Sequence, residues 1–370
     1  MAVTTIPWGD GSGDNIYLTY PSASGDQPVQ VSSDANTGSS SRTQTVTFTA
    51  SHHGTSDVKT LTVVQEGVPE QYIVFADPVV GQICATKWGD GTGIKPSQAA
   101  QVTNAQFGTT FRDNTQITSF DELRYFTGLT LLPANAFNGC SSLSEITLSE
   151  NIGQLYMNSL NLPNGSTLNL GDGSPYCTSG NAPGTRGITK VICKDLLQYI
   201  NFFSGNSNVS YSCVFGYSAG GAQLFDSDGN EITNCDIPNT VTKIYANTFA
   251  YNKSITSITI PSSVTTLGVF AFNNCPNVTG PIEIPSSVTR IENSVFENLG
   301  TTSSPVTYIM RGTTPPTITN RYVFTANRLD KIYVPYSSDH SILAAYQSAS
   351  NWSTFASYMV ELNPDGTIPT

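Results

Sequence analysis

The chain has 370 residues, of which 38% are hydrophobic and 12% charged, and its formal net charge is −11. This length and apolar content allow two or three domains with buried cores and exclude a disordered chain. The sequence has no basic cluster to displace counterions from phosphates and no run of about 20 apolar residues, so we expect neither nucleic-acid binding nor a membrane span.

Residues 1–67 are predicted to form a small β-sandwich. Two segments with alternating side chains, 43–49 and 59–65, flank a polar turn and indicate a β-hairpin. This hairpin and the segment that closes it resemble the BACON domain, a β-sandwich module of Bacteroidetes. The first residues lack the basic and apolar regions of a signal peptide, so we expect Met1 to be a natural start.

Residues 68–125 are predicted to form an N-terminal cap for the repeats that follow. The stretch 86–91 is similar to a degenerate EF-hand-like calcium loop. Asp90 and Gly91 match such a loop, but Thr86 and Trp88 stand where oxygen ligands are needed. A calcium site requires several oxygen ligands together, so the sequence predicts no metal site here.

Residues 126–370 contain internal repeats. Pro238, Pro261 and Pro285 recur at intervals of 23 and 24 residues within the phrase Ile-Pro-x-x-Val-Thr. A phenylalanine follows each phrase, and an earlier copy carries one as well. These four are Phe137, Phe249, Phe272 and Phe296. A single coil of about 23 residues cannot bury its own apolar face, so the repeats predict stacked coils with short parallel strands.

These repeats resemble the BspA-like leucine-rich repeats of Bacteroidetes, whose consensus is close to the stretch 136–143 and to the Ile-Pro phrases. The expected fold class is therefore mostly β, a small sandwich followed by a leucine-rich-repeat solenoid. Residues 150–236 lack the phrase and are expected to be an irregular insertion that closes with a hairpin at 226–230. Residues 336–370 are expected to form a C-terminal cap with a short helix at 341–349.

Catalytic and cofactor-binding patterns are sparse. His52 and His53 fall on the predicted hairpin tip and His340 falls near the C-terminal cap, where solvated loop histidines are expected. No nucleophile elbow, zinc motif or facing pair of carboxylates is indicated, so we expect no enzyme and no cofactor. The seven cysteines include no C-x-x-C pair, and the repeat positions of Cys140 and Cys275 predict buried packing residues.

Candidate binding residues come from the repeat alignment. Tyr245 and Tyr251 occupy turn positions where other copies carry mostly small or polar residues. Tyr322, beside Arg321, is a further candidate. Exposed rings on a rigid scaffold suit sugar recognition, whereas the alternative is that these rings pack beneath residues 150–236.

Two functions remain open. The first is a structural or fibre protein of a virion, from a crAss-like phage of Bacteroidetes. Such a protein would assemble in the host cytoplasm, attach to other virion proteins through residues 1–67, and bind host surface polysaccharide or protein. The second is a bacterial surface adhesin or glycan-binding lipoprotein whose signal peptide has been removed. Either could act as one copy or as a homo-oligomer.

Overall fold

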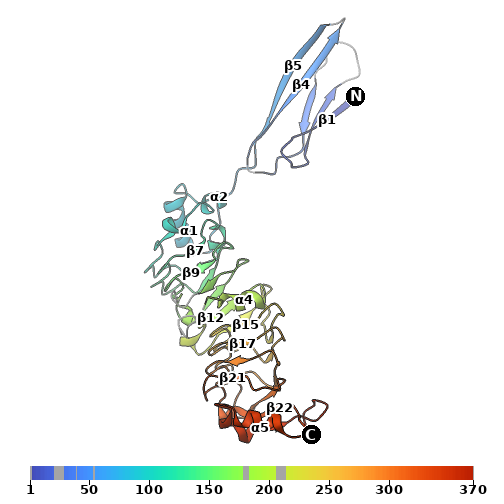
Figure 1. Ribbon diagram of the computed structural model, residues 1–370. Helices are drawn as coiled ribbons and strands as arrows, with labels where there is room; N and C mark the ends of the chain where they lie inside the picture. The colour runs from blue at the N-terminus through green and yellow to red at the C-terminus, as the bar shows by residue number, and fades with distance from the viewer. Residues whose placement is uncertain are drawn as a thin grey trace. The chain divides into compact units, whose positions relative to one another are not determined.

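The computed structural model describes residues 2–20, 29–38, 40–52, 55–177, 183–205 and 214–369. The chain divides into two compact units, Met1–Tyr72 and Ile73–Thr370 (Figure 1). Throughout the described ranges, the helices are too short or too polar to cross a lipid bilayer.

The first unit contains two antiparallel sheets. One sheet joins β1 (Ala2–Pro7), β2 (Asn15–Tyr20) and β3 (Gln30–Ser33), and the other is a hairpin of β4 (Arg42–His52) and β5 (Thr55–Gln65). A small apolar cluster of Trp8, Ile16, Leu18 and Val46 joins the two sheets. The predicted hairpin is therefore present, and its tip at His53 lies outside the described residues.

The second unit begins with short helices: α1 (Pro78–Trp88), α2 (Pro96–Ala99) and α3 (Asn104–Phe107). Asp77 caps α1, because its Oδ1 accepts hydrogen bonds from the backbone of Val79 and Val80. Its Oδ2 accepts from both the backbone and the hydroxyl of Thr118, at 2.6 and 2.9 Å. One carboxylate thus fastens the helical cap to the first coil of the solenoid.

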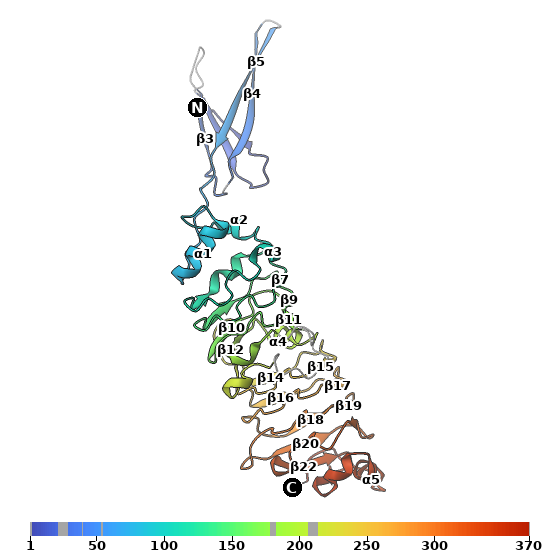
Figure 2. The same ribbon diagram turned by 90° about the vertical axis from the view of Figure 1, so that its left-hand side faces the viewer.

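The solenoid consists of stacked coils that contribute short parallel strands (Figure 2). A five-stranded sheet runs in the order β13 (Gln223–Phe225), β12 (Ile188–Ile192), β10 (Ser166–Asn169), β8 (Glu145–Thr147) and β6 (Ser119–Phe120). A second ladder joins β11 (Tyr176–Cys177), β9 (Gln154–Leu155) and β7 (Leu131–Leu132). Each ladder hydrogen-bonds one coil to the next.

The later coils continue with three more ladders. The first pairs β14 (Asn234–Asp236) with β16 (Ser257–Thr259). The second contains β15 (Lys243–Ile244), β17 (Thr266–Leu267), β19 (Arg290–Ile291) and β21 (Thr317–Ile318). The third contains β18 (Ile282–Ile284), β20 (Val306–Met310), β22 (Leu329–Val334) and β23 (Met359–Glu361). Mostly β structure with parallel repeats is thus the observed class.

Helical segments complete the coils and the C-terminal end. They are η1 (Asp121–Tyr125), η2 (Thr185–Gly187), α4 (Leu196–Phe202), η4 (Tyr217–Ala219), η5 (Ala326–Arg328), α5 (Ser341–Ser348) and η6 (Trp352–Tyr358). The indole nitrogen of Trp352 donates to the carbonyl of Pro316 at 2.7 Å, which fixes the C-terminal segment on the last coils. The helix predicted at 341–349 corresponds to α5.

The core contains a column of phenylalanine rings, one from each of four successive later coils. Phe249, Phe272, Phe296 and Phe324 stack with centroid distances of 5.2, 5.8 and 5.8 Å and nearly parallel planes. Phe137 is also buried, but its ring packs against Phe107, Phe111 and Phe120 rather than against another repeat phenylalanine. The N-terminal cap, which supplies Phe107, therefore covers the apolar core of the first coils.

The segment 150–236 is not an irregular insertion. It supplies β9 to β14, and β10 pairs in parallel with β8 on one side and with β12 on the other. The solenoid is continuous through this segment, although its sequence lacks the Ile-Pro phrase. The hairpin expected at 226–230 is present, because Phe225 bridges Glu231 and the backbone of Asp226 bonds to that of Asn230.

Cys213 lies outside the described residues, and five of the described cysteines are buried free thiols: Cys84, Cys140, Cys193, Cys235 and Cys275. Burial raises the pKa of Cys140 to about 11 and that of Cys275 to about 12. Their sulfurs donate to the carbonyls of Phe111 and Phe249, respectively, at 3.0 Å. Both act as packing residues between coils, in agreement with their repeat positions.

Candidate functional site

A polar groove runs along the carboxyl ends of the five-stranded sheet and has a volume of about 510 Å³. Each of the five coils contributes residues that follow its strand. The lining comprises Asp121, Arg124, Tyr125, Glu145, Thr147, Leu148, Glu150, Asn169, Gly171, Asp172, Lys194 and Ser227. We call this set the polar groove.

Carboxylates from three successive coils dominate the polar groove. Asp121 is half-buried, and its Oδ1 accepts a hydrogen bond from the hydroxyl of Thr147 at 2.9 Å. Glu150 and Asp172 are exposed on the next two coils. Lys194, from the coil of β12, places a cation at the far end. Arg124, which follows β6, adds a second cation, so the polar groove offers mainly hydrogen-bond acceptors with positive charges on the coils of β6 and β12.

The floor of the polar groove is held rigidly. Gln198 on α4 is 3% exposed, and its amide nitrogen donates to the carbonyls of Gly171 and Gly173 at 2.8 and 2.7 Å. A Cβ at Gly171 would lie 2.3 Å from the carbonyl oxygen of Leu148, so only glycine allows the coils to approach this closely. The groove lining combines carboxylate, amide and hydroxyl groups with the cations of Arg124 and Lys194.

The candidate tyrosines lie elsewhere, in the later coils. Tyr245 is half-buried against the core, and the ammonium of Lys243 lies 5.7 Å from its ring centre. Tyr251 is also half-buried, and its ring meets that of Tyr217 edge-on at 5.1 Å. Tyr217 belongs to the segment 150–236, beneath which the alternative interpretation expected the candidate rings to pack.

Tyr251 adopts a backbone conformation that is unusual for an aromatic residue. Its φ is 60°, and the equivalent positions in other coils are Gly139, Asn274 and Asn298. An L-residue other than glycine or asparagine held in the left-handed region costs about 1–2 kcal/mol. Phe270 and Ser294, in the next two coils, also have positive φ, so the repeats tolerate this conformation at more than one position.

Arg321 and Tyr322 form a separate exposed pair. The guanidinium of Arg321 donates to the hydroxyl of Tyr322 at 3.1 Å and lies 5.2 Å from the ring centre. Tyr322 precedes Phe324, whose ring is three places along the phenylalanine column from Phe249. The structure does not bring this pair together with Tyr251.

Residues that the sequence did not identify surround Tyr251. The guanidinium of Arg186 lies 4.6 Å from the ring centre of Tyr217, and Lys253 lies against the loop that follows Tyr217. We call Arg186, Tyr217, Tyr251 and Lys253 the ring cluster. The repeat pattern could identify Tyr251 alone, because Arg186 and Tyr217 come from coils without the consensus phrase.

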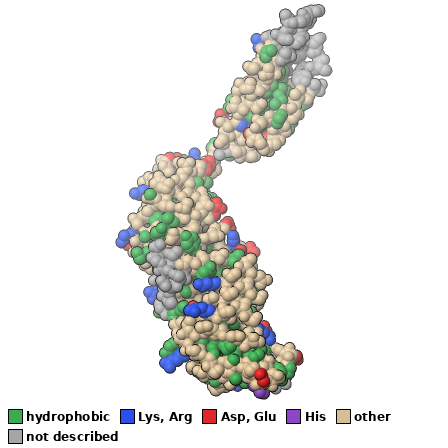
Figure 3. Space-filling model, viewed as in Figure 1, with side chains coloured by type: hydrophobic (Ala, Val, Ile, Leu, Met, Phe, Trp, Pro, Cys, Tyr) green, Lys and Arg blue, Asp and Glu red, His purple; other side chains and the backbone are tan. Residues whose placement is uncertain are grey.

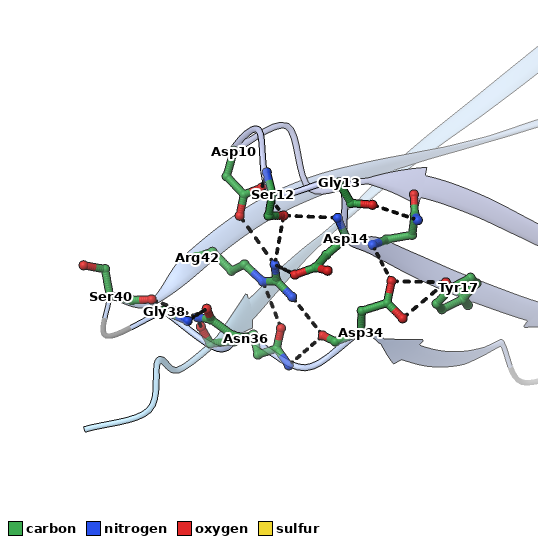
Figure 4. A network of polar contacts seen from close by, with 12 residues as sticks. Asp10, Ser12, Gly13, Asp14, Tyr17, Asp34, Asn36, Gly38, Ser40 and Arg42 are labelled. Atoms are coloured by element: carbon green, nitrogen blue, oxygen red, sulfur yellow. Dashed lines mark hydrogen bonds and ion pairs between the residues drawn. The ribbon is translucent and has the colours of Figure 1, made fainter. Parts of the chain in front are cut away.

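A buried polar network occurs in the first unit around Arg42, which is 8% exposed (Figure 4). Its guanidinium lies 4.4 Å from the ring centre of Trp8. Its nitrogens donate to Asp10, Ser12, Asp14, the carbonyl of Asp34, and Gln65. Because these acceptors come from three separate segments, the hydrogen bonds of Arg42 connect those segments of the first unit.

The remaining sequence candidates are not brought together. His340 pairs with Glu361 at 2.6 Å on the C-terminal cap, and His52 lies at the end of β4. Asp90 caps its own turn by accepting from the backbone of Thr92 and Gly93. No group of three or more potential metal ligands is placed together within the described ranges.

Comparisons with known proteins concern the second unit. The profile of the BspA type leucine rich repeat region matches six copies over residues 109–201, 184–303 and 218–352. A solved leucine-rich repeat protein from Eubacterium ventriosum ATCC 27560 is 17% identical, with a TM-score of 0.34, over 57% of this chain. The match spans 65% of that protein's chain. No curated protein sequence matches the chain.

Proposed function

Because the chain belongs to the family of proteins with BspA type leucine rich repeats, we propose that it is a non-catalytic attachment protein. Its solenoid binds a surface polysaccharide, and the polar groove carries this proposal. The groove crosses five coils, and neighbouring strands lie about 4.8 Å apart, so its length is roughly 19 Å. An extended polymer with many hydroxyl groups matches a row of acceptors on successive coils.

Removing two carboxylates tests the polar groove. We expect Glu150→Gln with Asp172→Asn to weaken binding of a surface polysaccharide purified from Bacteroidetes cells by about tenfold, since each lost hydrogen bond contributes about 0.5–1.5 kcal/mol. The matched control is Glu66→Gln with Asp330→Asn, which changes the net charge equally outside the groove. Equal losses in both double variants, or no loss in the first, would contradict the proposed site.

The first unit is proposed to be a BACON-like β-sandwich that anchors the protein to its carrier. Val58 and Val64 on β5 are 54% and 55% exposed, and Val3 on β1 is 58% exposed. Exposed apolar side chains on open sheet edges are typical of surfaces that another protein covers. The proposed carrier is a virion, because the buried free thiols suit assembly in a reducing cytoplasm.

Deleting residues 1–67 tests the anchor. The deletion is expected to abolish incorporation into particles and to leave the thermal unfolding of the solenoid unchanged, because that unit has its own core. Particles are purified and probed for the truncated chain. Normal incorporation of a folded truncated protein would rule out the anchor.

The second candidate function is that of a bacterial surface adhesin, which the family resemblance favours. It shares the polar groove and differs in the carrier. Labelling of intact bacterial cells by an antibody against the chain, with no signal on particles, would select this candidate.

A further inference from the structure

We infer that the ring cluster binds an anionic sugar of a polysaccharide, at a second site distinct from the polar groove. This inference rests on the proposed function only in taking a polysaccharide as the ligand. The rings supply a stacking surface and the two cations select the charge.

The backbone holds the ring cluster together. The N–H of Ala222 donates to the carbonyl of Tyr251 at 2.9 Å, and the N–H of Lys253 donates to the carbonyl of Ala222 at 2.8 Å. These bonds join the segment that follows Tyr217 to the coil that carries Tyr251. The edge-on contact of Tyr217 and Tyr251, with planes inclined by 74°, is therefore positioned by main-chain hydrogen bonds.

Lys253 is placed by a glycine. A Cβ at Gly221 would lie 2.7 Å from Cε of Lys253, and the φ of Gly221 is 126°. A residue with a side chain at position 221 would displace the lysine and would strain the loop. The lysine stem thus lies against the loop, beside the ring pair.

The two cations of the ring cluster have no carboxylate partner within the described part of the chain. Arg186 contacts the face of Tyr217, and neither Arg186 nor Lys253 forms an ion pair there. Such a pair of cations is notable in a chain of net charge −11. Figure 3 shows basic and hydrophobic side chains side by side over the middle of the solenoid.

The two cations without an ion-pair partner among the described residues are the observation that favours a ligand over simple packing, because the left-handed backbone of Tyr251 is shared by Phe270, with φ of 58°. Asn274 and Asn298 hold the equivalent position with φ of 56° and 58°, so asparagine serves the repeat without strain. The rings of Tyr251 and Phe270 are thus both held against a conformational cost, and the cations beside Tyr251 distinguish the ring cluster.

Sugar rings present apolar C–H faces that pack on aromatic side chains, and carboxylate or sulfate groups form charge-assisted hydrogen bonds with Arg and Lys. The ring cluster offers both features within one surface. A nucleic acid is held by many Lys and Arg side chains along its phosphates, whereas the ring cluster supplies two cations. An anionic sugar unit is therefore the ligand class that this chemistry selects.

The test measures binding of the full chain to immobilised polygalacturonate and to its methyl ester, which lacks the charge. We expect at least tenfold weaker binding to the ester. Arg186→Gln and Tyr251→Asn are each expected to weaken binding to polygalacturonate about five- to tenfold. Tyr251→Asn introduces the residue of the next two coils, so its thermal unfolding temperature should not fall.

The matched control is Arg112→Gln with Tyr336→Asn, an exposed arginine and an exposed tyrosine outside the ring cluster and the polar groove. It should bind polygalacturonate as the unchanged chain does. Equal binding to the ester, or full binding by both ring-cluster variants, would overturn the inference. If Glu150→Gln with Asp172→Asn weakened polysaccharide binding while the ring-cluster variants did not, the proposed function would be supported and the second site would be ruled out.

Discussion

Phe272→Ala is expected to lower the free energy of unfolding of the solenoid by about 3–5 kcal/mol. Phe272 is fully buried, and its ring stacks on Phe249 at 5.2 Å and on Phe296 at 5.8 Å. The substitution removes the middle ring of the column and leaves a cavity that rigid coils cannot close. Because each coil is stabilised mainly by its neighbours, the loss interrupts the array on both sides.

Denaturant unfolding followed by far-ultraviolet circular dichroism measures this effect. Tyr322→Ala is the control, since Tyr322 is 51% exposed and its loss should change the free energy of unfolding by less than about 0.5 kcal/mol. A loss below about 1 kcal/mol for Phe272→Ala would contradict the stacked phenylalanine core.

Arg42→Leu is expected to destabilise the first unit by about 3 kcal/mol, because it removes at once the hydrogen bonds that the buried guanidinium makes to three segments. The nearest contact is from Nη1 to Oδ2 of Asp14 at 2.7 Å, and Asp14 is 32% exposed. The substitution also cuts the ties to Gln65 and to the carbonyl of Asp34. A unit of this size has only a few kcal/mol of stability, so the effect is a large fraction of the total.

Native-state hydrogen exchange on the full chain separates the two units. Amides of β1 to β5 should lose protection in Arg42→Leu, whereas solenoid amides should not change. Arg42→Lys keeps the charge but loses the planar guanidinium. Its amide protection in the first unit is expected to lie between that of the unchanged chain and that of Arg42→Leu. Unchanged amide protection in the first unit would show that the network around Arg42 does not stabilise that unit.

The sequence predicted the solenoid because its apolar positions recur with a fixed period. Cys140 and Cys275 are buried as their repeat positions required. The continuity through 150–236 was missed because the Ile-Pro phrase is absent there. The period itself persists, since Leu132 and Leu155 pair in register and the amide of Asn158 reaches Asn135, at a spacing of 23 residues.

The two proposed binding surfaces were harder to predict. Tyr251 stood out because its repeat position otherwise carries small or polar residues, but its partner Tyr217 lies in a segment with no recognisable repeat. The polar groove depends on side chains that follow five different strands, and their positions along the coil differ. Asp121, Glu150 and Asp172 become neighbours only through the stacking of coils. Both proposed surfaces form where coils that are distant in the sequence stack on one another, and a local sequence pattern does not specify that stacking.

Carboxylate footprinting tests the central claim most directly. The chain is labelled with a carbodiimide and an amine in the presence and absence of the purified surface polysaccharide, and the labelled residues are identified by mass spectrometry. The polysaccharide should protect Asp121, Glu150 and Asp172, which line the polar groove, and should leave Glu66 and Asp330 unprotected. Unchanged labelling of Asp121, Glu150 and Asp172 while the polysaccharide is bound would contradict the account.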